Sequence, residues 1–191
     1  SVSLSSSDVD GDALTYFAQV DANATVSVDG SILTVMPVQD YNGYIIVSVT
    51  VTDGQFGDSD SFILSVTPIN DAPVISAISD QVIEEDNSLT LELSASDVDD
   101  GDILTFSASD GSADISVDGN ILTVTPEADF NGEINVDVTV TDGDLFDSTS
   151  FTITVEPVND APVLDALSDA TTSEDTAYSI SLSSSDVDGD A

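Results

Sequence analysis

Apolar residues recur at every second position along most of this chain, which is the period of a β-strand that faces a core on one side. Leu89, Leu91 and Leu93, for example, alternate with polar residues. The other alternating runs in the same region are 104–108, 122–124, 134–140 and 151–155. A further strand is expected near 74–78, and no stretch shows the 3.6-residue period of an amphipathic helix. The pattern therefore predicts an all-β chain.

The chain repeats itself with a period of 89 residues. Asn70-Asp71-Ala72-Pro73 recurs as Asn159-Asp160-Ala161-Pro162, a shift of 159 − 70 = 89. Asp-Gly and Asn-Gly turn signals separate the strand-like runs at 118–119, 131–132 and 142–143. About seven short strands within such a period indicate an immunoglobulin-like β-sandwich in each repeat.

Three portions of this repeat are expected along the chain. They are a repeat that lacks its first strands (1–69), a complete repeat (70–158) and the opening strands of a third repeat (159–191). The segments 1–12 and 179–190 differ only at Val2 and Ile180. The chain is therefore expected to be part of a longer tandem array of repeats.

The charge of the chain has one sign only. Its 191 residues include 38 Asp and Glu and no Lys, Arg or His, which gives a formal charge of −38. No side-chain salt bridge can form. The chain is not expected to bind nucleic acids or anionic membranes, because it has no basic side chain to neutralise their phosphates. A disordered acidic tail would be poor in apolar residues, whereas 40% of this chain is hydrophobic. A chain with a core and uncompensated carboxylates indicates cations as part of its folded state.

Composition also argues against catalysis and membrane insertion. Without His, Lys, Arg or Cys, the chain has no usual general base, Schiff-base amine or thiolate nucleophile, so it is expected not to be an enzyme. A glycosidase uses a pair of carboxylates, but carboxylates are so numerous here that finding two close together does not indicate a catalytic site. No apolar run approaches the length of a transmembrane helix.

Acidic residues gather between the predicted strands in motifs that recur with the repeat. The motifs and their copies are Asp8-Val9-Asp10-Gly11-Asp12 with 97–102 and 186–190, Glu85-Asp86 with Glu174-Asp175, and Asn70-Asp71 with Asn159-Asp160. Single acids recur as well, Asp40 with Asp129 and Asp53 with Asp142. Calcium takes six to eight oxygen ligands, and alternating Asp residues in a loop can direct two carboxylates at one ion.

These motifs supply the candidate calcium ligands. They are Asp8, Asp10, Asp40, Asp53, Asn70, Asp71, Glu85, Asp86, Asp97, Asp99, Asp102, Asp129, Asp142, Asn159, Asp160, Glu174, Asp186 and Asp188. Ordinary turns are the alternative: Asp29-Gly30 and Asp118-Gly119 are interpreted in that way, and Asp40 and Asp129 can equally precede a tight turn whose aromatic packs inward. An EF-hand starting at Asp8 fails, because its sixth position is Ala13 and its twelfth is Gln19.

In their order along the chain, these motifs resemble those of a cadherin repeat. Glu85-Asp86 stands where cadherins carry an opening glutamate motif, Asp97-Val98-Asp99 at the Asp-x-Asp motif, Asp129-Phe130-Asn131 near the Asp-Arg-Glu motif, Val140-Thr141-Asp142-Gly143 at an Ala-x-Asp-x-Gly stretch, and Val158-Asn159-Asp160-Ala161-Pro162 at the linker. The chain is most similar to the bacterial cadherin-like tandem repeats, of roughly 90–100 residues, found in giant secreted adhesins. One departure is that Asn131 replaces the motif's glutamate, so that ligand is missing.

The resemblance implies calcium at the junctions between repeats. The first junction would use Asp40, Asn70, Asp71, Asp97, Asp99 and Asp142, and the second would use Glu85, Asp129, Asn159, Asp160, Asp186 and Asp188. Asp8, Asp10 and Asp53 would face a preceding repeat. The number of ions at each junction is left open.

These inferences give two main expectations about function. The first is an extender segment of a bacterial extracellular adhesin or surface filament, in which calcium clamps neighbouring repeats into a stiff rod. The second is a binding module of a larger secreted protein that recognises a glycan or another copy of the chain. With 4 Tyr, 7 Phe and no Trp, a tryptophan platform for glycans is impossible. Filament assembly by strand exchange and adaptation to high salt are further alternatives.

Overall fold

The computed structural model describes residues 1–111 and 113–189 and divides the chain into two compact units, Ser1–Asn70 and Asp71–Ala191. Every regular element among the described residues is a β-strand, so the predicted all-β class is confirmed. This part of the chain holds no helix with the length and apolar character needed to cross a membrane. Asp190, the last acid of the third Asp-rich motif, lies outside the described residues.

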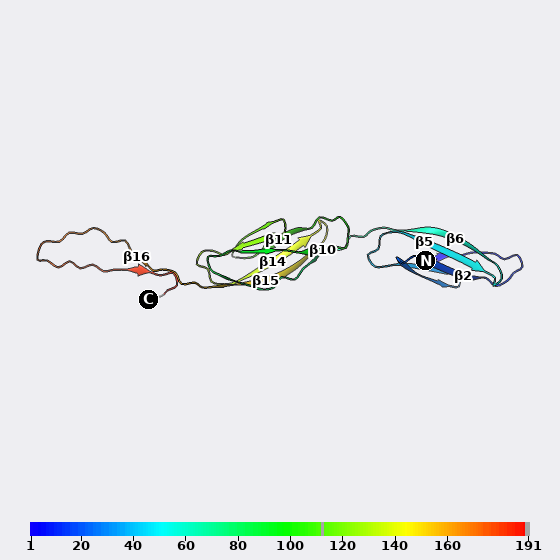
Figure 1. Cartoon of the computed structure of the whole chain (residues 1–191), viewed down its shortest axis with the longest axis horizontal. Coiled ribbons are helices and arrows are strands. Elements are labelled where there is room, and N and C mark those ends of the chain that lie inside the picture. The colour runs from blue at the N-terminus through cyan, green and yellow to red at the C-terminus, as the bar shows by residue number, and fades with distance from the viewer. Residues whose placement is uncertain (112, 190–191) are drawn as a thin grey trace. The chain divides into compact units, whose positions relative to one another are not determined.

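The unit that starts at Asp71 contains a complete β-sandwich (Figure 1). Its strands are β7 (Val74–Ile75), β8 (Gln81–Glu84), β9 (Leu89–Glu92), β10 (Ala95–Ser96), β11 (Thr105–Ser109), β12 (Asp114–Asp118), β13 (Ile121–Thr125), β14 (Gly132–Thr141) and β15 (Phe146–Glu156). One sheet has the order β11-β14-β15-β8, the other has the order β12-β13-β9, and β7 pairs with β10. All these pairs are antiparallel except the pair of β8 with β15, which is parallel.

The core of this sandwich forms because each strand turns every second side chain inward. Val136 on β14 and Ile153 on β15 are 0% exposed, and Leu122 and Val124 on β13 join them from the other sheet. Between these inward positions the strands carry exposed polar residues such as Asn135. The alternating runs predicted at 122–124, 134–140 and 151–155 are therefore confirmed as half-buried strands.

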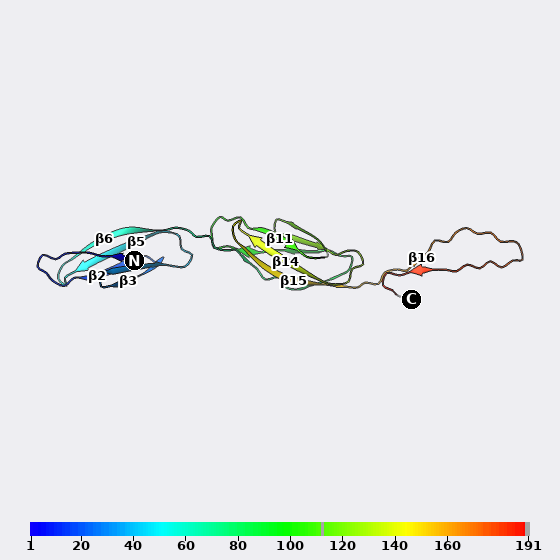
Figure 2. The same ribbon diagram turned by 180° about the vertical axis from the view of Figure 1, so that it is seen from behind.

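The unit Ser1–Asn70 repeats part of this architecture (Figure 2). Its strands are β1 (Val2–Ser3), β2 (Thr15–Val20), β3 (Ala24–Asp29), β4 (Ile32–Pro37), β5 (Gly43–Thr52) and β6 (Gly57–Val66). The sheets have the orders β2-β5-β6 and β1-β4-β3, and all pairs are antiparallel. Leu33, Ile45 and Val47 are at most 1% exposed and form the centre of a smaller core with Ala24.

The two units differ at one sheet edge. In the unit from Asp71, β8 lies along β15, whereas β6, the counterpart of β15, has no such partner among the described residues. Phe62 on β6 is 39% exposed, while its counterpart Phe151, 89 positions later, is 3% exposed. In the complete sandwich β7, which also contacts β15, and β8 lie on this side of the core.

The segment that follows the complete sandwich contains two short strands. β16 (Val163–Leu164) pairs antiparallel with β17 (Ser184–Ser185). This pair repeats the pairing of β7 with β10. The described residues between β16 and β17 form no further strand, and they are exposed.

A core truncation tests the packing of the complete sandwich. Phe151→Ala is expected to lower the free energy of unfolding by about 3–5 kcal/mol, because the ring fills the space between the sheets. Phe146 lies on the same strand but is 69% exposed, so Phe146→Ala is the matched control, with an expected change within about 0.5 kcal/mol. Urea denaturation at a fixed calcium concentration measures both. Equal losses in the two variants would contradict this account of the core.

Candidate metal centre

Strand directions bring several acidic loops together at one end of the complete sandwich. Because β8 runs parallel to β15, the residues that follow the two strands, Glu85 and the segment 157–160, lie at the same end. β14 is antiparallel to β15, so the turn that precedes it, with Asp129, lies at that end as well. Three separate parts of the sequence therefore supply carboxylates to one place.

Glu85 is the central residue of this end. It is 3% exposed and is the only charged side chain that is buried among the described residues. Its Oε1 accepts a hydrogen bond from the backbone N–H of Val158 at 2.6 Å, and its Oε2 accepts one from Asn131 Nδ2 at 3.4 Å. A buried carboxylate is costly unless it is paired, and this chain has no basic side chain to pair with it.

Asp160 belongs to two groups of carboxylates at this end. Glu85, Asp160 and Asp188 form one group, and Asp86, Asp129 and Asp160 form the other, each with oxygens within 4.8 Å of one another. The backbone N–H of Asp160 also donates to Asp188 Oδ2 at 2.6 Å. Desolvation raises the pKa of Asp160, and the charges of Asp129, Asp188, Asp86 and Glu85 raise it further. Crowded negative charge therefore surrounds Asp160.

The turns that carry Asp86 and Asp129 have unusual backbone angles. Their φ values are 62° and 58°, in the left-handed region that Asp tolerates better than most residues. The backbone N–H of Asp129 donates to Asp86 Oδ1 at 3.2 Å, which joins the two turns. Phe130 packs against the core, so Asp129 does precede a tight turn with an aromatic packed inward. Its membership of a carboxylate group shows that the two interpretations of this motif are compatible.

A third carboxylate group lies in other loops of the same unit. Asp97, which follows β10, Asp102 and Asp142, which follows β14, place oxygens within 4.8 Å of one another. Asp142 Oδ1 accepts backbone hydrogen bonds from Asp144 and Leu145, both at 2.7 Å. These bonds fix the Asp142 carboxylate in the β14–β15 turn.

Asp97 shows that this third group suits a cation. Its Oδ1 accepts the backbone N–H of Asp99 at 3.0 Å. Its Oδ2 is buried and, within the part of the chain that the structure describes, has no hydrogen-bond partner. Desolvation raises the pKa of Asp102, followed by the charges of Asp97, Asp99 and Asp142 among others. Within the described residues, Asp97 Oδ2 is buried, has no donor and lies among other carboxylates. A metal ion would be a better partner for it than any side chain that this chain contains.

In the equivalent loops of the unit Ser1–Asn70, the carboxylates of Asp8 and Asp53 accept hydrogen bonds from backbone N–H groups of their own loops. Asp8 Oδ1 accepts N–H groups from Asp10 and Gly11 at 2.8 Å. Asp53 Oδ1 accepts those of Phe56 and Gln55 at 2.6 and 2.7 Å, and these bonds lower the pKa of Asp53. Among the described residues of this unit, no group of three carboxylates meets the 4.8 Å distance.

The predicted ligands therefore fall into two sets. The structure brings together Glu85, Asp86, Asp97, Asp102, Asp129, Asp142, Asp160 and Asp188. It does not place the remaining acids in such a group, namely Asp8, Asp10, Asp40, Asp53, Asp71, Asp99, Glu174 and Asp186, and these carboxylate distances say nothing of Asn70 and Asn159. Some of this second set support the loops instead: Asp99 Oδ2 accepts the backbone N–H of Asp71 at 2.8 Å, and Asp186 Oδ1 accepts that of Asp188 at 3.0 Å. Ligation by either set stays a prediction.

One contributor was not recognised from the sequence. Asn131 stands where a cadherin glutamate was expected, and the sequence suggested only that a ligand had been lost there. In the structure its amide donates to Glu85 Oε2 and helps to orient that carboxylate. The recurrence of Asn42 and Asn131 in both repeats was the available signal.

Comparison with known sequences gives this fold a family. Residues 1–67 and 70–156 match the family model described as bacterial Ig domain. Chitinase A of Pseudoalteromonas piscicida is 32% identical over 174 residues, which are 86% of this chain and 20% of that protein. The chain thus spans about a fifth of the length of this curated relative.

Solved structures with the same fold include cadherin fragments. Human protocadherin-24 EC1-2 matches with a TM-score of 0.54 and 18% identity, over 81% of this chain and 87% of that one. Protocadherin gamma B7 domains 1–4 match with a TM-score of 0.50 and 21% identity, over 83% of this chain and 46% of that one. At such identities the likeness shows the fold alone. The chain belongs to the bacterial Ig domain family, of which it contains two tandem members with a cadherin-like β-sandwich fold.

Proposed function

We propose that this chain is a non-catalytic accessory segment of a larger secreted bacterial protein, and that calcium bound to its acidic loops fixes the complete Ig domain to the segment that follows it. The observation that carries the proposal is the meeting of Glu85, Asp86 and Asp129 from the complete sandwich with Asp160 and Asp188 from the segment after it. Five carboxylates from both sides share this place, and the chain contains no basic side chain to neutralise them.

The chemistry of the ligands favours calcium over other metals. All candidate donors are oxygens, and the absence of Cys and His removes the usual ligands of zinc and copper. Magnesium demands near-ideal octahedral geometry and keeps several waters, whereas calcium accepts six to eight oxygens in flexible geometry. A group rich in carboxylates on separate loops suits the flexible, oxygen-rich coordination of calcium. Asp160, which belongs to two groups, would bridge two neighbouring ions.

Bound calcium would act as a clamp on the segment after β15. The Val158 N–H to Glu85 Oε1 bond joins the sandwich to the segment after it, and the Asp160 N–H to Asp188 Oδ2 bond holds two parts of that segment together. Mutual repulsion of the carboxylates opposes these bonds. A divalent ion converts that repulsion into attraction on both sides, so removal of calcium is expected to loosen the segment.

The family context supports an accessory role. The curated relative is named a chitinase, and this chain matches a fifth of it, so a segment of this kind occurs within a larger protein named for action on chitin. The lack of His, Lys, Arg and Cys leaves these domains without an imidazole base, a side-chain amine or a thiolate nucleophile, so carboxylates are the only side chains that ionise near neutral pH. The chitinase relative favours this context over the adhesin or filament that the cadherin-like repeats suggest.

Calcium should stabilise the chain against heat. A ligand that binds only the folded state adds about 2.7 kcal/mol per site at 100 times its dissociation constant, which moves the unfolding midpoint by several degrees. Differential scanning calorimetry in excess EDTA and in millimolar calcium measures the shift, and magnesium is the control. A midpoint that ignores calcium, or that responds equally to magnesium, would refute the calcium proposal.

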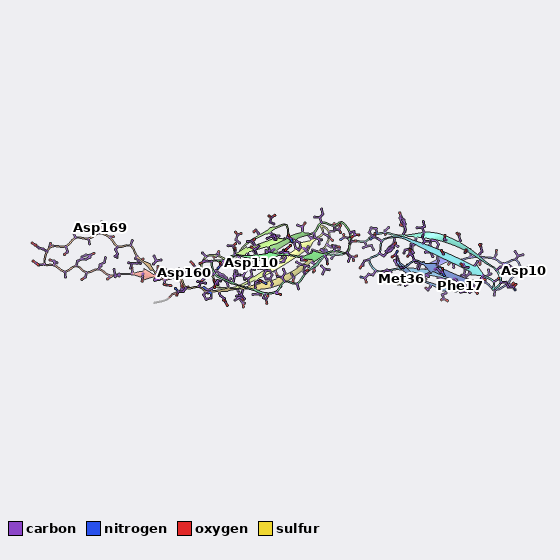
Figure 3. The ribbon with its side chains drawn as sticks, viewed as in Figure 1. Asp10, Phe17, Met36, Asp110, Asp160 and Asp169 are labelled. Atoms are coloured by element: carbon purple, nitrogen blue, oxygen red, sulfur yellow. The ribbon has the colours of Figure 1, made fainter. Side chains whose placement is uncertain are left out.

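Removal of one shared carboxylate should have opposite effects in the two conditions. Asp160→Asn in EDTA is expected to raise the unfolding midpoint, because the Asp160 charge is crowded by like charges. In calcium the same variant is expected to lose most of the calcium-induced rise. Asp169→Asn is the matched control, since Asp169 is exposed and belongs to none of the carboxylate groups (Figure 3). An unchanged calcium response in Asp160→Asn would remove Asp160 from the site.

Calcium should also protect particular backbone amides. The N–H of Val158 donates to Glu85, so its exchange reports whether the segment is held to the sandwich. The N–H of Asp160 donates to Asp188, so its exchange reports whether the carboxylate group around Asp160 is ordered. Hydrogen–deuterium exchange is expected to slow at least tenfold at these amides on calcium addition, with little change at amides within β14. Equal exchange with and without calcium would show that the ion does not fix the segment.

A further inference from the structure

The outward face of the sheet β2-β5-β6 carries apolar side chains that the second domain lacks. Phe17 on β2 is 56% exposed, Tyr44 and Ile46 on β5 are 71% and 58% exposed, and Ile63 on β6 is 66% exposed. Their inward neighbours on β5, such as Ile45, are buried. These four residues, here called the apolar face, are therefore not part of the core.

The strand pairings identify the same positions in the complete domain. Phe17 pairs with Thr50, as Ser107 pairs with Thr139. Tyr44 pairs with Ser65, as Glu133 pairs with Thr154. Ile46 pairs with Ile63, as Asn135 pairs with Thr152. The positions of the apolar face are thus occupied by Ser107, Glu133, Asn135 and Thr152 in the other domain. That domain folds with polar residues there, so the fold itself does not require the apolar ones.

The same face is free of charge in a highly acidic chain. No outward position of β2, β5 or β6 carries a carboxylate, whereas the complete domain has Glu133 and Asp137 on its corresponding face. Asp58 and Asp60 of β6 pair with Val51 and Val49, and alternation directs them to the opposite face. The polar residues between the apolar ones are uncharged hydrogen-bonding groups such as Gln19 and Ser48.

The apolar face stays open when the sheet gains a strand. In the complete domain, β8 extends the sheet at the edge of β15 and lies beside it in the same layer. A strand that paired with β6 in the same way would lie next to Ile63 and would not cover it. The exposure of these four side chains therefore does not depend on the open edge of β6.

We propose that the apolar face binds a single chain of an uncharged polysaccharide. Phe17 and Tyr44 are separated by six residues along β5 (Thr50 to Tyr44), or about 20 Å at ~3.3 Å per residue, so the face suits an extended ligand. An aromatic ring offers an apolar surface to the C–H face of a sugar, and Tyr adds a hydroxyl. Gln19 and Ser48 between the rings can bond sugar hydroxyls.

Other ligands fit the face less well. An anionic polymer meets a chain of formal charge −38 with no basic group, so long-range repulsion opposes it. A second copy of the chain carries the same charge. A stable protein–protein interface buries about 800 Å² on each partner, which is more than four separated side chains supply. The uncharged polysaccharide remains the occupant that matches the neutrality of the face and the spacing of its rings.

A pull-down on insoluble polysaccharides tests this proposal. The intact 191-residue chain is incubated with chitin, with cellulose and with an insoluble anionic gel of cross-linked alginate as control. Retention is expected on at least one uncharged polymer and not on alginate. The double variant Phe17→Ser/Tyr44→Ser is expected to lose at least tenfold in retention. Met36→Thr is the matched control and is expected to bind as wild type, because Met36 is 65% exposed on the other sheet and its counterpart in the complete domain is Thr125 (Figure 3).

The outcomes separate this proposal from that of calcium binding. Retention measured in EDTA and in calcium is expected to be similar, since the apolar face includes no carboxylate, so a failed calcium test leaves this one unaffected. Circular dichroism checks that the double variant folds. No retention on either uncharged polymer, equal retention of the double variant, or preference for alginate would overturn the proposal. A concentration-dependent dimer in sedimentation, abolished by the double variant, would also overturn it in favour of self-association.

Discussion

The absence of any basic side chain is the constraint on which the rest of this structure depends. In most proteins a loop carboxylate can meet Lys or Arg, but here it can meet only a backbone N–H, an uncharged side-chain amide or hydroxyl, water, a proton or a metal ion. The fold makes wide use of the first option: Asp147 Oδ2 accepts the N–H of Ile75 at 3.0 Å, and Asp80 Oδ1 accepts that of Thr152 at 2.8 Å. Hydrogen bonds to an ionised acceptor are about twice as strong as neutral ones. Acidic residues thus help to hold strand ends in place.

Some carboxylates are buried or crowded by like charges, and these indicate where a cation could bind. Glu85 is buried with two hydrogen bonds, and Asp97 Oδ2 has no partner within the described residues. Asp160 and Asp102 have raised pKa values, to which like charges contribute. All four residues belong to carboxylate groups formed by loops of the complete domain and by the segment that follows it. The crowded carboxylates and the unpartnered Asp97 Oδ2 therefore coincide with the motifs that resemble cadherin repeats, and that coincidence supports the calcium proposal.

Much of the fold could be predicted because its signals are local. Alternation at 134–140 defines β14, and Asp-Gly at 118–119 defines the hairpin turn between β12 and β13. The β8 strand was not predicted, because Gln81–Glu84 is short and pairs in parallel with residues 72 positions later. Asn131 was missed as an orienting group for the same reason: its contact with Glu85 spans 46 positions. The apolar face could not be predicted from the sequence, because only the strand pairing shows which residues of β2, β5 and β6 share an outward surface.

The parallel contact between β8 and β15 also bears on how this domain folds. Gln81 and Ile153 can meet only after the hairpins between them have formed, because closing so long a loop early has a high entropic cost. Local hairpins such as β14–β15 form first, and β8 docks late. Until then, β15 is an edge strand with unpaired backbone groups, which is the kind of surface on which strands from two molecules exchange. We therefore expect domain swapping to compete with folding during the interval before β8 docks.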